Sequence, residues 1–127
     1  MTSILAWAYA ALAALPFALQ LALALGAPWG RLSLGGRFDG ALPGAWRPLA
    51  LVQAGVLVLM ALAVLTRGGA LDLGWPSWTF WLTIVLTGLT TLANAASRSP
   101  QERALWTPVA ALMLALALVI AWRTAGA

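Results

Sequence analysis

The sequence contains no cysteine and no histidine, and only 8% of its 127 residues are charged. Without cysteine there can be no disulfide, no thiolate nucleophile and no thiolate metal ligand. Without histidine the chain lacks the usual ligand for haem, copper or catalytic zinc, and also the usual general base near neutral pH. These absences predict a protein with no cofactor, no metal site and no enzymatic activity of its own.

What the chain has in abundance is apolar residues. They make up 63% of the sequence, and the mean hydropathy is +0.94, whereas a soluble domain carries about 25% charged residues. The formal net charge is +4, but the arginines that produce it are scattered among predicted helix ends and loops. We therefore expect an integral membrane protein, with a lipid bilayer as its surroundings and no nucleic acid partner.

Four apolar runs are long enough to cross a bilayer, because a hydrocarbon core of about 30 Å needs about 20 helical residues. We predict an all-α membrane protein, one domain over residues 1–127, with four transmembrane helices in an antiparallel bundle. The helices are expected at about 4–26, 46–66, 78–96 and 100–122, with the longest loop at 27–45. The first run lacks the basic start of a signal peptide and exceeds its apolar length, so we interpret it as a membrane helix.

Residues between the runs mark helix ends. Ser99 is a candidate N-cap, Pro100 suits the first helical position, and Glu102 completes a capping box. Gly68 or Gly69 is expected to take the left-handed conformation that ends the second helix.

Arginine placement predicts the orientation. Five arginines lie on the side of the first and third loops and two on the other side, which makes the first side cytoplasmic by the positive-inside rule. Both termini are then outside. Tryptophans near both interfaces, among them Trp29, Trp46 and Trp106, are interpreted as interfacial anchors. The arginine-only basic set and high alanine content suit a GC-rich bacterium, so the expected location is the inner membrane, as a multi-pass protein.

The third helix carries a stripe of polar residues. At about 100° per residue, its members fall within an arc of about 80°; they are Thr79, Thr83, Thr87, Thr90, Asn94 and Ser97. One interpretation is a packing face whose hydroxyls bond to their own helix. The other is a hydrated path, although no ionisable residue lies in a membrane interior, where proton-coupled carriers place one.

A second polar group is expected at the cytoplasmic end. Gln20, Gln53 and Asn94 lie at similar depths, so the three amides are predicted to meet. Beyond them we expect a collar of charged residues: Arg31, Arg37, Arg47, Arg98, Glu102 and Arg103. The collar has two interpretations, a vestibule that binds anions or a set of anchors for anionic lipid headgroups below interhelical amide bonds.

The longest loop contains Gly35-Gly36 between short flanks, which predicts a hairpin folded back on the cytoplasmic interface. The stretches "GAPWGRLSLGGRFDGALP" and "NAASRSPQERALWTPVA" resemble segments of small uncharacterised bacterial four-helix integral membrane proteins. The resemblance implies an integral membrane protein and supplies no catalytic residues.

Two functions follow as hypotheses. The first is a non-catalytic structural or accessory component of a membrane assembly, either a homo-oligomer or part of a larger complex. Small residues at four-residue spacing on the first helix favour it; they are Ala6, Ala10, Ala14, Ala18, Ala22 and Gly26. The alternative is a small transporter or channel for a neutral or anionic solute, which would use the polar face of the third helix. An enzyme acting on lipid headgroups through Glu102 ranks below both.

Overall fold

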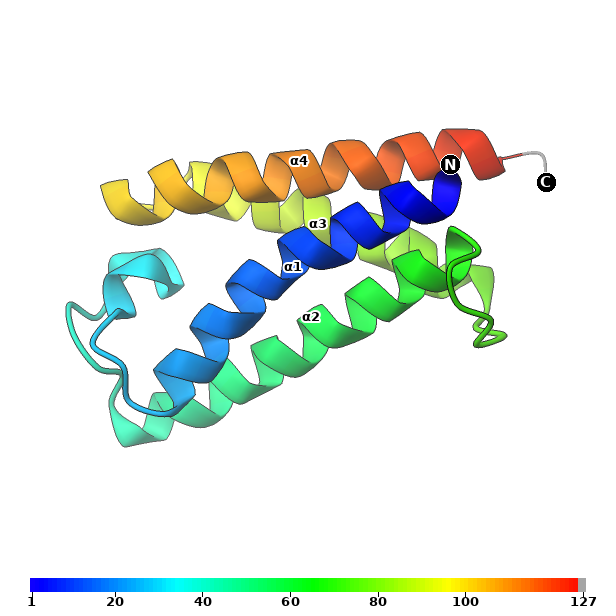
Figure 1. Ribbon diagram of the computed structural model, residues 1–127. Coiled ribbons are helices and arrows are strands. Elements are labelled where there is room, and N and C mark those ends of the chain that lie inside the picture. The colour runs from blue at the N-terminus through cyan, green and yellow to red at the C-terminus, as the bar shows by residue number, and fades with distance from the viewer. Residues whose placement is uncertain (126–127) are drawn as a thin grey trace.

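The computed structural model describes residues 1–125, and within this range the chain is helical with no strand (Figure 1). The four long helices are α1 (Thr2–Ala24), α2 (Arg47–Arg67), α3 (Ser77–Ala95) and α4 (Pro100–Thr124). Three short 3-10 turns, η1 (Gly30–Leu32), η2 (Leu34–Gly36) and η3 (Gly44–Trp46), lie in the loop between α1 and α2. The prediction of an all-α protein is confirmed, and the helix ends lie within two residues of the expected positions.

The helices form two antiparallel pairs, with α1 packed on α2 and α3 packed on α4. The pairs meet mainly through α1 and α4, and less through α2 and α3. The start of α1 and the end of α4 lie at one end of the bundle, which we call the terminal end (Figure 1). The long α1–α2 loop lies at the opposite end, which we call the loop end.

Three helices are long and apolar enough to cross a bilayer: α1, α4, and α2 extended by η3 (Gly44–Arg67). This is the signature of an integral membrane protein. Helix α3 has only 19 residues, and its five threonines and one asparagine lower its mean hydropathy. By length and composition, therefore, three of the four helices could cross a membrane.

The helices end where predicted, but the capping box of α4 is only half formed, because the Ser99 N–H donates to the Ser97 hydroxyl and the Glu102 carboxylate accepts the Gly35 N–H instead. Ser99 caps α4, since its hydroxyl accepts the Glu102 backbone N–H at 3.3 Å and Pro100 follows it directly. After α2, Gly69 has the left-handed φ of +77°. The Ala70 N–H then bonds to the Leu65 carbonyl at 2.9 Å, which satisfies one of the carbonyls that a helix end leaves free.

The buried apolar residues form two clusters, one near each end of the bundle. The terminal-end cluster contains Ala6, Tyr9, Ala13, Val64, Leu65, Phe80, Met113, Ala117, Ile120 and Ala121. The loop-end cluster contains Leu19, Leu23, Leu42, Ala50 and Trp106. Hydrogen bonds also join helices at the terminal end, where Arg67 donates to the Thr124 hydroxyl at 3.0 Å and Arg123 donates to the Thr2 hydroxyl at 3.1 Å.

Candidate functional site

A cavity of about 420 Å³ lies between the four helices and the α1–α2 loop. Its polar lining residues are Gln20, Ser33, Gln53, Thr87, Thr90, Asn94 and Glu102. The three amides that the sequence placed at one depth thus share this cavity, as do two threonines of the α3 stripe and the one acidic residue of the predicted collar. We call this space the loop-end cavity.

The side-chain amides that line the cavity form no hydrogen bonds with one another within residues 1–125. Gln20, only 8% exposed, donates to the Ser33 hydroxyl through a long bond of 3.4 Å. Within residues 1–125, the side chains of Gln53, Thr90 and Asn94 make no hydrogen bond to protein. Interhelical amide bonds, one of the two interpretations of this level of the bundle, are therefore not formed, and these groups face the cavity with their bonding capacity unused.

Most of the α3 threonines bond to their own helix. Thr83, Thr87 and Thr91 each donate to the carbonyl four residues earlier, at 2.7–2.8 Å. Because the Thr87 proton is used in this way, the Tyr9 hydroxyl donates to the Thr87 oxygen, at 2.8 Å. The stripe therefore divides along its length: Thr79 and Thr83 line a separate hollow nearer the terminal end, whereas Thr87 and Thr90 line the loop-end cavity.

The loop closes the cavity at the loop end through three hydrogen bonds to the first turns of α4. The Trp106 indole N–H donates to the Leu32 carbonyl at 2.8 Å, and the Ser99 hydroxyl donates to the Arg31 carbonyl at 2.7 Å. The Gly35 N–H donates to the Glu102 carboxylate at 3.1 Å. These bonds hold the residues around η1 and η2 over the cavity.

The predicted hairpin at Gly35-Gly36 was wrong, because this part of the loop forms 3-10 turns. Leu34, Gly35 and Gly36 all have positive φ values, and the loop directs backbone groups to α4 side chains instead of to an opposite strand. Gly36 also lies so close to α4 that a Cβ there would be 2.6 Å from the Ser99 Cβ.

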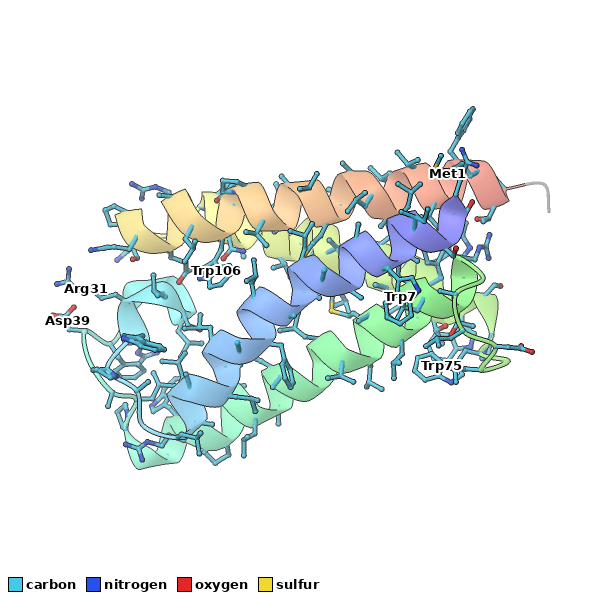
Figure 2. The ribbon with its side chains drawn as sticks, in the orientation of Figure 1. Met1, Trp7, Arg31, Asp39, Trp75 and Trp106 are labelled. Atoms are coloured by element: carbon cyan, nitrogen blue, oxygen red, sulfur yellow. The ribbon has the colours of Figure 1, made fainter. Side chains whose placement is uncertain are left out.

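Trp106 is not the interfacial anchor that we expected. Its side chain is 8% exposed and lies between α4 and the loop (Figure 2). The spacing Ser99, Glu102, Trp106 places all three residues on one face of α4, and this face meets the loop. From this spacing, the sequence could have predicted the contact between the α1–α2 loop and α4.

The arginines of the predicted collar are not brought together, and none of them lines the cavity. Arg31 pairs with Asp39 at 2.8 Å on the exposed surface (Figure 2). The hydrogen bond that Arg31 donates to the Asp39 carboxylate, together with the negative charge of Asp39, raises the pKa of Arg31. Arg37 lies over the Trp46 ring, with 4.8 Å between guanidinium carbon and ring centre.

The three other arginines also have separate environments. Arg47 donates to the Leu42 carbonyl at 3.0 Å, and Arg103 donates to the Ser97 carbonyl at 2.6 Å. Arg98 is exposed at the turn before α4. Glu102 is consequently the single charged side chain among the residues that line the cavity.

The cavity opens sideways between α2 and α3. Its lining residues Val56, Thr90 and Ala93, which lie on these two helices, are exposed. A second hollow continues between the same helices toward the terminal end and shares Val56 and Met60 with the first. Its lining is mainly apolar, with Leu59, Ala63 and Leu82 among its members. The α2–α3 side is therefore where the bundle is open to its surroundings.

No family model, curated protein or solved structure matches this chain. The function is accordingly argued from the residues of the loop-end cavity alone.

Proposed function

We propose that this protein is a small membrane carrier that binds a small molecule in the loop-end cavity. The observation that carries the proposal is a set of polar side chains from three helices, Gln20, Gln53, Thr90 and Asn94, that converge on one cavity with little or no protein bonding. Gln53 and Asn94 are half-buried and Thr90 is exposed on the α2–α3 side, so inside a bilayer these polar groups would lack water as well as a protein partner, which costs about 1–3 kcal/mol for each group. A bound molecule with matching polar groups would offset this cost.

A carrier fits the packing better than an open channel does. Toward the terminal end, the interior of the bundle is filled by fully buried side chains such as Phe80, Val64 and Ile120, and the second hollow runs along the α2–α3 side. The bond between Tyr9 and Thr87 joins α1 to α3 at this level. A solute in the cavity would therefore need a rearrangement of helices to pass further, which is the property of a carrier.

The proposal includes α3 as a fourth membrane span. Helix α3 packs along α4, and its exposed side is apolar, with Val85, Leu89 and Leu92 among its exposed residues. A helix with a lipid-suited outer face and hydroxyls turned inward is suited to a bilayer. By the positive-inside rule the loop end would be cytoplasmic, and the host membrane would be the inner membrane of a bacterium.

Cysteine labelling tests this topology cleanly, because the native chain has no cysteine. Ser77→Cys and Ala96→Cys place single thiols at exposed positions next to the two ends of α3. A membrane-impermeant maleimide should label Ser77→Cys from outside the cell and Ala96→Cys only after the cytoplasmic side is opened. Labelling of both from the same side would show that α3 does not cross.

A structural or accessory role is the second candidate. Of the small residues on α1, Ala6 and Ala13 are buried inside the bundle, but Ala14 and Ala18 are exposed one turn apart. Such a surface allows close approach of a helix from a second copy or from another membrane protein. Ala14→Leu should then reduce the mass of the particle extracted in mild detergent, whereas a carrier that acts alone would keep its mass.

The experiment for the carrier uses two neighbouring alanines of α4. Ala110 is buried and lines the cavity, while Ala111 is exposed on the outside of the same helix. Ala110→Phe fills part of the cavity, and Ala111→Phe is the matched control with the same added volume. Native mass spectrometry of protein extracted from its own membrane should detect a bound small molecule in the wild type and in Ala111→Phe, but not in Ala110→Phe.

Far-UV circular dichroism and the melting temperature establish that both variants keep their fold. Uptake of the identified molecule into proteoliposomes should show the same order among the three proteins. Equal occupancy in all three, or no small molecule in any, would contradict the carrier proposal.

A further inference from the structure

We infer that the ligand of the loop-end cavity is an amphipathic organic cation, with its charged group beside Glu102 and its apolar body between Met60 and Met113. The inference rests on the proposed function, since it assigns a chemical class to the molecule in the same cavity. Three observations support it: the charge of the residues that line the cavity, the change in polarity along the depth of the cavity, and the side on which the cavity opens.

The charge of the lining is the first step. Glu102 is 5% exposed and has no arginine partner, because Arg31–Asp39 is the single ion pair within residues 1–125. A buried carboxylate without a counter-charge is costly. An anionic ligand would add a second negative charge to a space without arginine, so the anionic solute of the sequence-based alternative does not fit this lining.

The position of Glu102 keeps its carboxylate oriented toward the cavity. One oxygen accepts the Gly35 N–H at 3.1 Å, and the Ser97 hydroxyl lies beside the group. Glu102 also lies in the first turn of α4, where the helix dipole favours a negative charge. These contacts hold the carboxyl group at the cavity wall but supply no counter-charge, so a bound cation would be its charge partner.

Polarity changes with depth along the cavity. Glu102 and Asn94 lie in the helix turns nearest the loop end, and Gln20 lies four residues before the end of α1. Met60 and Met113 each lie 13 residues from the loop-end start of their helices, or about 20 Å at 1.5 Å per residue. The cavity is therefore polar and acidic at one end and apolar at the other.

The two methionines could accommodate a bulky apolar group of the ligand without requiring one particular shape. Methionine side chains are flexible and polarizable, and they adapt to ligands of different shape. The sideways opening between α2 and α3, at Val56 and Ala93, would admit such a molecule from the hydrocarbon of the bilayer. A lipophilic cation that partitions into membranes could reach the cavity by this route.

The experiment compares three probes of similar shape and different charge. Tetraphenylphosphonium is the cation, tetraphenylborate the anion and triphenylmethanol the neutral molecule. Binding is measured by equilibrium dialysis against the full-length protein in nanodiscs of phosphatidylcholine, with empty nanodiscs subtracted. The zwitterionic lipid keeps the membrane surface from concentrating either ion.

The variant is Glu102→Gln, with Asp72→Asn as a charge-matched control in the exposed α2–α3 connection. Glutamine has nearly the same shape as glutamate, and its amide oxygen can still accept the Gly35 N–H, so the fold should be retained. We expect saturable binding of tetraphenylphosphonium to wild type and Asp72→Asn. Binding to Glu102→Gln should be at least tenfold weaker, or about 1.4 kcal/mol.

Other outcomes separate this inference from the carrier proposal. Binding of tetraphenylborate or triphenylmethanol as tight as that of the cation, abolished by Ala110→Phe but unchanged in Glu102→Gln, would overturn the cationic assignment and leave the carrier proposal standing. Equal binding of the cation to wild type and Glu102→Gln would also overturn it. Failure of all three probes would overturn it as well, and the carrier proposal would then depend on the copurified molecule alone.

Discussion

The hydrogen bond between Tyr9 and Thr87 allows a quantitative test of how α1 and α3 are joined above the cavity. Tyr9 is 0% exposed, and its hydroxyl lies 2.8 Å from the Thr87 oxygen. Thr87 in turn donates to the Thr83 carbonyl at 2.7 Å. The perturbation is a double-mutant cycle made of Tyr9→Phe, Thr87→Val and the two changes together.

The magnitudes follow from which groups lose their partners. Tyr9→Phe removes the donor but leaves the Thr87 hydroxyl bonded to its own helix, so the loss should be about 0.5–1.5 kcal/mol. Thr87→Val leaves the Tyr9 hydroxyl buried without a partner, and this should cost about 1–3 kcal/mol. The double variant lacks both hydroxyls and should cost less than the sum. The coupling free energy should be about 0.6 kcal/mol, the average that such cycles give for hydrogen bonds inside a membrane protein, and no more than about 1.7 kcal/mol, their maximum.

The assay is reversible unfolding in mixed micelles with increasing sodium dodecyl sulfate, followed by far-UV circular dichroism. Thr83→Val is the control, because the Thr83 hydroxyl bonds only to the Thr79 carbonyl of its own helix. Its cycle with Tyr9→Phe should be additive within about 0.3–0.5 kcal/mol. If the Thr87 cycle is additive to the same degree, the bond between α1 and α3 contributes nothing and the reasoning is refuted.

Three further predictions concern the loop. Gly36→Ala should destabilise the protein more than Gly35→Ala, because both have positive φ but only at Gly36 would the new Cβ meet Ser99, at 2.6 Å; unfolding midpoints in the same micelles compare them. Trp106→Phe removes the hydrogen bond to the half-buried Leu32 carbonyl, at a cost of about 0.5–1.5 kcal/mol, and should speed proteolysis of the η1–η2 segment. Unchanged cleavage would contradict the closure of the cavity by this bond. Asp39→Asn breaks only an exposed ion pair, so its unfolding free energy should change by no more than about 1 kcal/mol, and a larger change would contradict the surface assignment.

The depth of each polar side chain along its helix was the part of the site that the sequence could predict. Gln20, Gln53 and Asn94 lie on three different helices, yet counting residues from the helix ends placed them at one level, and all three line the cavity. A helix rises about 1.5 Å per residue whatever its surroundings. The same count placed the arginines at the loop end correctly, but it did not predict that they would bond to loop carbonyls, an aromatic ring or Asp39 instead of forming one group.

The sequence by itself determined the helical class, the helix ends and the polar face of α3. These properties depend on local chemistry: apolar runs of sufficient length, Ser99 before Pro100, and the left-handed Gly69 after α2. Each follows from residues within a few positions of one another.

The tertiary structure alone decided which helix faces meet. It placed the loop on the Ser99, Glu102 and Trp106 face of α4, it left the side between α2 and α3 open, and it kept the arginines out of the cavity. The physical reason is that helical periodicity assigns each side chain to a face but leaves free the rotation of that face relative to other helices. This rotation depends on the packing of all four helices and the loop together.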